Sequence, residues 1–122
     1  DVLTANKLGT IAFSPLAQGM LTDRYLHGIP EDSRAGRSSS PFPNAERVQE
    51  TIEKSRALNE IAQRRGQTLA EMAVAWILRD GKVTSVLIGA SRVSQIDDNV
   101  KALENLAFSN EELDEIEAVL AK

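Results

Sequence analysis

The sequence predicts an α/β fold in which parallel strands are joined by helical crossovers. Two short apolar runs, Ile11–Phe13 and "VTSVLI" at residues 83–88, have the length and composition of buried strands. Helical periodicity fills residues 45–81 between them and residues 93–122 after the second run. Strands separated by helices pair in parallel, but two strands cannot cover their own faces and edges. The chain is therefore predicted to be part of a larger sheet or barrel.

Composition limits the domain number and the function. The chain has 122 residues, 42% hydrophobic and 26% charged, which suits one modest globular domain. A net charge of −4 argues against sequence-independent nucleic-acid binding, which needs a basic surface. The absence of cysteine excludes disulfides and thiolate metal sites, and a single histidine, His27, excludes a histidine-rich metal centre. No apolar run approaches the ~20 residues of a membrane span, and "DVLTANKLG" lacks a signal-peptide shape, so a cytoplasmic protein without a membrane partner is expected.

The first strand is expected to open into a long loop. Residues 22–44 hold two glycines, three prolines and three consecutive serines, a composition typical of long functional or disordered loops. A helix is then expected from an N-cap at Asn44 to Gly66, and a capping box of Thr68 and Glu71 starts a second helix. The apolar positions expected to face the core are Val48, Ile52, Leu58, Ile61 and Ala62 in the first helix, and Leu69, Met72, Ala73, Trp76 and Ile77 in the second.

Gly81 closes the second helix and leads into the second strand. Two further helices are predicted after that strand. The first of them carries the apolar residues Ile96, Val100 and Leu103 on one side. The last begins at a second capping box, formed by Ser109 and Glu112, and its apolar residues are Leu113, Ile116 and Leu120.

Polar residues follow the second strand. Gly89 would let a ligand approach the backbone, and Ser91 with the free N–H groups of the next helix favours an anion. Arg92 can add a charge-assisted bond to phosphate, while Gln95 and Asn99 offer donor–acceptor pairs suited to a base edge or a ribose. An ordinary N-capped amphipathic helix with a solvated polar face explains the same spacing, so the residues alone leave both interpretations open.

The end of the first strand has a similar character. Pro15 fixes a turn, Gly19 permits close approach, and Ser14 and Gln18 can donate hydrogen bonds. The loop that follows contains three arginines: Arg24, Arg34 and Arg37. It is either an ordinary surface loop with scattered cations or a loop whose arginines bind phosphate. No GxGxxG, P-loop or nucleophile elbow is present.

The stretches "AFSPLAQGMLTDRYLHGIPEDSR" and "TSVLIGASRVSQIDDNVKAL" resemble the C-terminal part of aldo-keto reductases, and the resemblance covers residues 5–122. It includes bacterial glyceraldehyde 3-phosphate reductase-like enzymes and the β subunits of voltage-gated potassium channels. The implied fold is the C-terminal portion, strands 7 and 8 with their helices, of a (β/α)8 TIM barrel. The implied divisions are residues 1–21 (strand 7 region), 22–44 (cofactor-covering loop), 45–81 (helices), 83–92 (strand 8 and adenosine-phosphate loop) and 93–122 (C-terminal helices).

The resemblance also implies an NADP(H) site at the mouth of the barrel. Arg24 matches a basic residue that reaches the cofactor phosphates, Arg34 matches an arginine of the covering loop, and Asp98 stands where relatives often carry Glu. The turn against the nicotinamide end and the pyrophosphate is matched by Phe13, Ser14, Pro15, Leu16, Ala17 and Gln18. The family's residues that bind the adenosine 2′-phosphate and adenine are matched by Gly89, Ser91, Arg92, Gln95, Asp98 and Asn99.

The expected function is the NADPH-binding part of an oxidoreductase that reduces aldehydes or ketones to alcohols by hydride transfer. No position matches the family's catalytic Asp, Tyr, Lys and His, and 122 residues fall short of the roughly 250 of a barrel, so a fragment without activity of its own is expected. Its expected partners are a small carbonyl substrate and the remaining strands of the barrel, from the same parent chain or another copy. The sequence leaves open whether the protein forms a homo-oligomer. The alternatives are a non-enzymatic NADPH-binding regulatory subunit, as in the channel β subunits, and a small helical interaction module.

Overall fold

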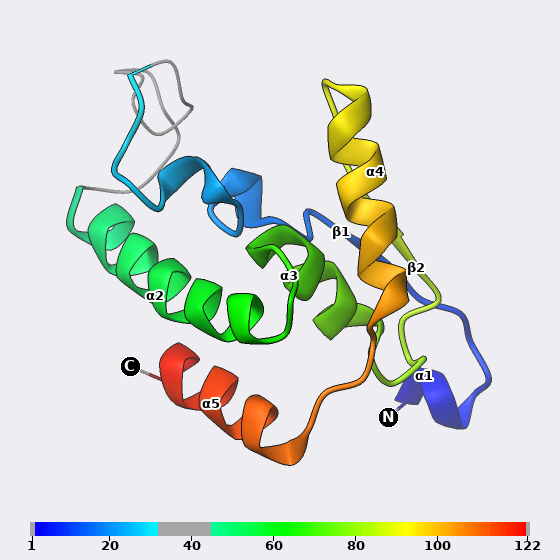
Figure 1. The fold of residues 1–122 in the computed structure, drawn as a ribbon. Coiled ribbons are helices and arrows are strands. Elements are labelled where there is room, and N and C mark those ends of the chain that lie inside the picture. Colours follow the sequence, from blue (N-terminus) through cyan, green and yellow to red (C-terminus); the bar gives the residue numbers. More distant parts are fainter. Residues whose placement is uncertain (1, 32–44, 122) are drawn as a thin grey trace.

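The computed structural model describes residues 2–31 and 45–121, and in these residues two strands lie beside a group of helices (Figure 1). The expectations for Arg34, Arg37 and Asn44 lie outside the described residues. No described helix is long and apolar enough to cross a membrane. In chain order the elements are α1 (Val2–Ala5), β1 (Ile11–Phe13), η1 (Ala17–Gly19), η2 (Asp23–Tyr25), α2 (Ala45–Arg64), α3 (Leu69–Leu78), β2 (Ser85–Leu87), α4 (Val93–Lys101), η3 (Ala102–Glu104) and α5 (Asn110–Leu120).

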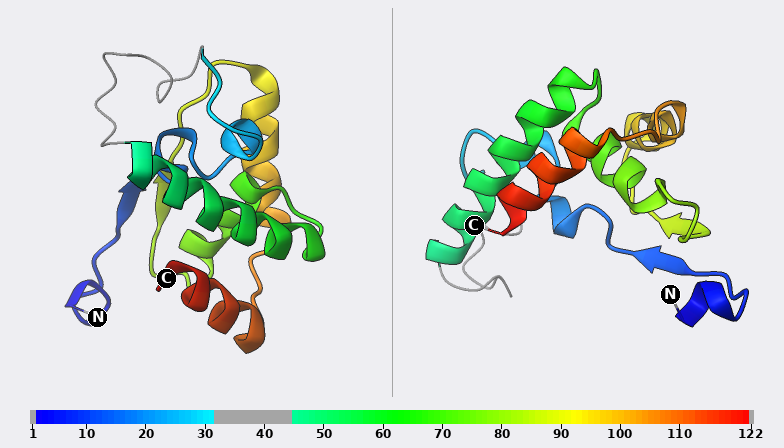
Figure 2. Two further views of the ribbon diagram at one scale, coloured as in Figure 1. Left: turned by 90° about the vertical axis from the view of Figure 1, so that its left-hand side faces the viewer. Right: turned by 90° about the horizontal axis from the view of Figure 1, so that it is seen from below.

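The sheet of the described residues consists of β1 and β2, which pair in parallel with Phe13 opposite Leu87. Both strands lie where the sequence predicts them, but the expectation that they are buried is wrong for one face. The middle residues Ala12 and Val86 are half-buried, whereas Ile11, Phe13 and Leu87 are 64, 79 and 58% exposed. Side chains alternate between the two faces of a strand, so one face of this sheet is left open. Figure 2 shows β1 and the N-terminal segment reaching away from the helices.

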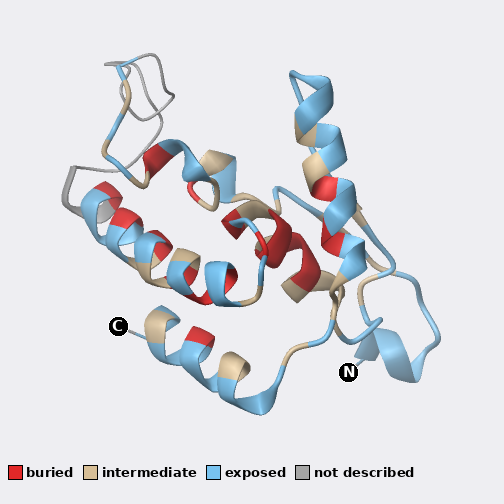
Figure 3. Ribbon diagram, in the orientation of Figure 1, coloured by how far each residue is buried: buried red, intermediate tan, exposed pale blue. Residues whose placement is uncertain are grey.

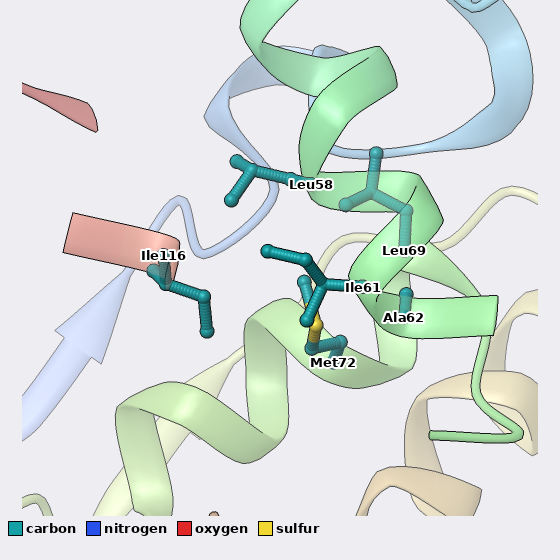
Figure 4. Packing of buried hydrophobic residues seen from close by; sticks show 6 residues of the cluster. All are labelled: Leu58, Ile61, Ala62, Leu69, Met72 and Ile116. Atoms are coloured by element: carbon teal, nitrogen blue, oxygen red, sulfur yellow. The ribbon is translucent and has the colours of Figure 1, made fainter. Parts of the chain in front are cut away.

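The main core lies where α2, α3 and α5 meet. All five apolar positions predicted to face the core from α2 are buried, because they share one face of that helix. Methionine and branched aliphatic side chains fill the space between the three helices, as the low aromatic content of 4% requires. The six residues that point toward one another there are Leu58, Ile61 and Ala62 of α2, Leu69 and Met72 of α3, and Ile116 of α5 (Figure 4).

Helix α3 is enclosed on two sides, which the sequence pattern does not predict. Leu69 and Met72 are buried as expected, but Val74 and Ala75 are also buried, against Ala102 of η3. The helix contacts α2 on one side and α4 with η3 on the other, so a single apolar stripe cannot describe it (Figure 3). The other predicted stripe residues are only half-buried and line an apolar groove: Ala73, Trp76 and Ile77.

Helix α4 has its apolar side exposed and one polar residue buried. Ile96 and Val100 of α4 and Leu103 of the following η3 are 47, 56 and 58% exposed, whereas Asn99 of α4 is 7% exposed. The polar face predicted for solvent or a ligand therefore includes a position that faces the protein. The apolar side of α4, like the open face of the sheet, has no cover among the described residues.

Both predicted capping boxes are confirmed. Thr68 Oγ1 accepts a bond from the Glu71 N–H at 3.1 Å, and Glu71 Oε2 accepts one from the Thr68 N–H at 3.0 Å. Ser109 and Glu112 make the same pair of bonds at 3.2 and 2.9 Å. In the first turn of α5 the backbone N–H of Glu111, and then the Ser109 hydroxyl, lower the pKa of the Glu111 carboxyl. These local bonds satisfy N–H groups that the helix itself leaves without partners.

Arg65, which follows α2, ties that helix to the segment that leads into α5. Its side chain is only 2% exposed, and its Nη1 lies 2.5 Å from Glu112 Oε2. Nη2 donates to the Ala107 carbonyl at 2.8 Å, and Nε donates to Gln67 Oε1 at 3.0 Å. The guanidinium also stacks over the Phe108 ring, 3.6 Å from its centroid. A planar cation with five donors suits this set of partners, which a lysine could not reproduce.

Replacing Arg65 by alanine is expected to reduce the free energy of unfolding by about 2–4 kcal/mol, because Glu112 and the Ala107 carbonyl lose the donors of a buried guanidinium. The matched control is Arg64→Ala, since Arg64 pairs with Glu115 where both side chains are at least half exposed. That change is expected to alter stability by no more than about 0.5 kcal/mol. Urea denaturation followed by circular dichroism measures both variants. Equal losses in the two variants would contradict the role given to Arg65.

Candidate functional site

The segments that leave the two strands emerge at one edge of the sheet. Because β1 and β2 run in parallel with Phe13 opposite Leu87, the residues that follow each strand, 14–19 and 88–92, share that edge. The carboxyl ends of parallel strands are where α/β proteins bind ligands. The fold therefore brings together the two polar segments that the sequence analysis selected independently.

The turn after β1 has an unusual backbone. Ser14, Ala17 and Gln18 have positive φ values of 55, 47 and 60°, although none is glycine, and Gly19 has a φ of 98°. Such residues cost about 1–3 kcal/mol each and persist only where their surroundings hold them. Leu16 lies in the bridge region (φ −100°, ψ 15°) and is followed by left-handed Ala17. The N–H groups of Ala17 and Gly19 donate to the Ser14 and Leu16 carbonyls at 3.1 and 2.9 Å, so the N–H groups of Leu16 and Gln18 are the ones that this turn can offer to an anion.

The other candidates near this turn differ in exposure. Phe13 is 79% exposed at the sheet edge, so its ring is open to stacking. Pro15 is half-buried, and Arg24 is exposed in η2, where its N–H donates to Thr22 Oγ1 at 3.3 Å. Tyr25 is only 1% exposed within the core. It therefore serves packing, a role that sequence reasoning missed because the residue stands alone in a polar loop.

In the loop after β2 three donors converge on one oxygen. Gln95 Oε1 accepts from the Ser91 N–H at 2.8 Å, from the Ser91 hydroxyl at 3.2 Å and from the Arg92 N–H at 3.2 Å. Gly89 is exposed, and a Cβ added there would meet no described heavy atom within 4 Å. The loop thus keeps open space at Gly89. Gln95 engages both donors of Ser91 and the Arg92 N–H, and leaves the exposed Arg92 side chain as the cation of this loop.

The inward side of α4 carries an acceptor without a donor. Asn99 Nδ2 donates to the Gln95 carbonyl at 2.6 Å, but Asn99 Oδ1 is buried and has no partner among the described residues. Buried acceptors are normally satisfied, so this oxygen has capacity for a donor that the described residues do not supply. Asp98 lies elsewhere on the helix, 3.5 Å from Lys101 Nζ in an exposed ion pair.

This edge can bind and orient an anionic, aromatic ligand. It offers backbone N–H groups, the Arg92 cation, an exposed phenyl ring and side-chain amides. The described residues include no group of three or more His, Cys, Asp or Glu that could hold a metal ion.

Two hollows of the described residues lie mostly away from the segments that follow the strands. A polar cleft of about 510 Å³ lies between the end of α2, the start of α3 and η3, and Arg65, Glu71, Lys101 and Glu104 are among its lining residues. The apolar groove of about 190 Å³ lies among α2, α3 and α5. Of the predicted site residues only Pro15 reaches either hollow. The candidate site is an open edge, which is consistent with a binding site of which the described residues form one part.

Comparison with known proteins agrees with the resemblance found in the sequence. The model of the family described as "Aldo/keto reductase family" matches residues 1–121. An L-glyceraldehyde 3-phosphate reductase of Escherichia coli O157:H7 is 50% identical over 124 aligned positions, which cover 99% of this chain and 36% of that protein. A probable voltage-gated potassium channel subunit beta of Oryza sativa subsp. japonica is 40% identical over 116 positions, 93% of this chain and 35% of that one. The chain thus spans about a third of the length of these relatives.

Solved structures agree on the fold. A glycerol dehydrogenase of Gluconobacter oxydans superimposes with a TM-score of 0.77 at 21% identity, over 98% of this chain and 36% of that one. An aldo-keto reductase of Bacillus halodurans in a holo form gives 0.67 at 23% identity, over 97% and 35%. The predicted fold class, an α/β portion of a TIM barrel with two strands and their helices, is confirmed.

Replacing Gln95 by methionine is expected to release the loop at Ser91 and Arg92, because the oxygen that collects their donors is lost. Amide hydrogen exchange of these two residues, followed by NMR, is expected to speed up about fivefold, the effect of one hydrogen bond of about 1 kcal/mol. Gln95→Glu is the matched control because it keeps an acceptor at the same place. Unchanged exchange in the methionine variant would show that Gln95 does not order the loop.

Proposed function

The chain belongs to the aldo/keto reductase family, and we propose that it forms the NADPH-binding part of an oxidoreductase that reduces aldehydes or ketones to alcohols. The observation that carries this proposal is the shared sheet edge: the two segments that resemble the family's cofactor-binding stretches leave adjacent parallel strands at the same end. The identity of 50% to an L-glyceraldehyde 3-phosphate reductase supports a reductase that acts on a carbonyl.

The residues at the edge fit the cofactor in the order that the resemblance implies. The aromatic Phe13 suits the nicotinamide end because it offers a ring face, and the turn of residues 14–18 suits the pyrophosphate because it offers the N–H groups of Leu16 and Gln18. When bound, NADPH supplies the hydride, and this chain binds and orients it. Arg24 is exposed, as a phosphate partner must be. Arg34 stays a prediction, since it lies outside the described residues.

The adenosine end is assigned to α4 and the loop before it. Arg92 is exposed and its guanidinium can pair with the 2′-phosphate, while both Ser91 donors are held by Gln95 within the loop. Gln95 uses its oxygen to hold this loop, which leaves its amide nitrogen to donate outward. The Oδ1 of Asn99 is buried and faces the protein, so Asn99 stays a prediction as an adenine contact.

The open face of the sheet requires a partner surface. Phe13 and Leu87 on the strands, and Val100 on α4, are more than half exposed although they are large and apolar. Large apolar side chains left exposed on two neighbouring strands suit an interface. Because the chain covers 36% of its reductase relative, we propose the remaining barrel strands as this partner, from the same parent chain or from another copy.

The second candidate is a regulatory subunit that binds NADPH without turnover. The identity of 40% to a probable voltage-gated potassium channel subunit beta favours it, and its cofactor-binding residues would be the same. Turnover of NADPH with an aldehyde in the complete parent protein would decide for the reductase. Tight binding without turnover there would decide for the subunit. A helical interaction module, the third alternative, would be indifferent to nucleotides.

Arg92→Ala is expected to weaken binding of NADPH by about 10- to 100-fold, because a charge-assisted bond to phosphate contributes about 1.5–3 kcal/mol. Binding of NADH, which lacks the 2′-phosphate, is expected to stay unchanged. Isothermal titration of the 122-residue chain with both cofactors measures this difference. Lys82→Ala is the control: it also removes one exposed cation, which pairs with Asp80. An equal loss for both cofactors in Arg92→Ala would contradict the assignment, and no binding of either by the unaltered chain would count against the proposed function.

The 122-residue chain alone is expected to reduce no aldehyde or ketone with NADPH, because no residue matches the family's proton donor. The measurement is NADPH oxidation at 340 nm by purified chain whose intact mass excludes longer species. Carbonyl reduction by that sample would overturn this expectation.

A further inference from the structure

The strained turn after β1 is held by α2 at the residue where the turn ends. Ser55 lies on the buried side of α2, 1% exposed, and its Oγ lies 2.9 Å from the Met20 carbonyl. Met20 directly follows Gly19 and is itself 4% exposed. The bond joins residues 35 positions apart, so it connects the turn to a separate element.

The contact with Met20 is more than a by-product of burying a serine. Ser55 Oγ also lies 2.9 Å from the Thr51 carbonyl, one turn earlier in the same helix, so its single O–H is shared between the two carbonyls. The Met20 carbonyl accepts no backbone hydrogen bond from the described residues, and Ser55 supplies its donor. Since an orphaned buried carbonyl is unfavourable, this geometry holds Met20 in place.

Apolar contacts and a second polar bond on α2 reinforce this attachment. The side chains of Met20 and Tyr25 pack against Val48 and Ile52 of α2 in one buried cluster. A Cβ added at Gly19 would already touch the Tyr25 ring, at 3.5 Å from Cε2.

Further along the loop, Arg56 of α2 donates from Nε to the Leu26 carbonyl at 2.7 Å. Two adjacent side chains of α2 thus bind carbonyls on both sides of η2. The segment that follows the turn is tied to the helix at two points.

We propose that Ser55 is a positioning residue for the cofactor turn. By holding Met20, its hydroxyl keeps Ala17 and Gln18 left-handed, and so keeps the N–H groups of Leu16 and Gln18, which make no backbone bond in the turn, available to the pyrophosphate. The assignment rests on the proposed function for its ligand, but the hold on the turn can be measured without any cofactor. Ser55 lies outside both sequence stretches that carry the family resemblance.

The first test is amide hydrogen exchange of the 122-residue chain in three variants. Ser55→Ala is expected to speed exchange at Ala17, Gly19 and Leu21 about fivefold more than elsewhere, the effect of one lost hydrogen bond. Ser55→Thr, which keeps a hydroxyl, is expected to restore slow exchange. Ile61→Val is the control, because it trims a buried α2 residue that belongs to the other side of the core. Equal acceleration throughout the chain in Ser55→Ala would overturn the proposal.

The second test separates the turn from the adenosine loop by cofactor affinity. Both NADPH and NADH contain the pyrophosphate, so Ser55→Ala is expected to weaken both about fivefold, unlike Arg92→Ala, which is expected to weaken NADPH alone. Unchanged affinity in Ser55→Ala would overturn the link to the pyrophosphate. If the unaltered chain binds neither cofactor, the proposed function fails, while the exchange measurement still decides whether Ser55 holds the turn.

Discussion

The parallel pairing of β1 with β2 is the constraint on which the candidate site depends. It sets Phe13 opposite Leu87 and thereby sends the turn after one strand and the loop after the other to the same edge. An antiparallel pairing of the same residues would place these segments at opposite ends of the sheet. Every proposed contact with a dinucleotide, which must extend from the turn to the loop, follows from this one relation.

Among the described residues, the helices pack against one another on one side of the sheet only. Helices α2, α3 and α5 build the main core, and Arg65 closes it by joining α2 to the segment before α5. This packing leaves one face of the sheet and the apolar side of α4 exposed. The described residues are therefore well packed on one side and uncovered on the other (Figure 3). A TIM barrel resolves this asymmetry, because its interior is filled by residues from alternate strands and its helices pack around it.

The polar segments at the sheet edge are preorganised by hydrogen bonds within the protein. Gln95 gathers the donors of Ser91 and Arg92, and the hydroxyl of Ser55 fixes the end of the strained turn. Gln95 and Ser55 come from different helices but have the same effect. Each side chain forms a hydrogen bond with the backbone of a segment that follows a strand and thereby orients that segment. Preorganisation of this kind reduces the entropy lost when a ligand is bound.

The sequence by itself determined the features that depend on neighbouring residues. The capping box of Thr68 and Glu71, the positions of both strands and the polar loop before α4 follow from local spacing, as does the family resemblance. Only the tertiary structure decided that Asn99 faces inward from a polar helix side, and that Ser55 meets Met20. Burial and hydrogen bonding between distant segments depend on how the elements pack, and hydrophobic periodicity within one element carries no information about the neighbour that it will meet.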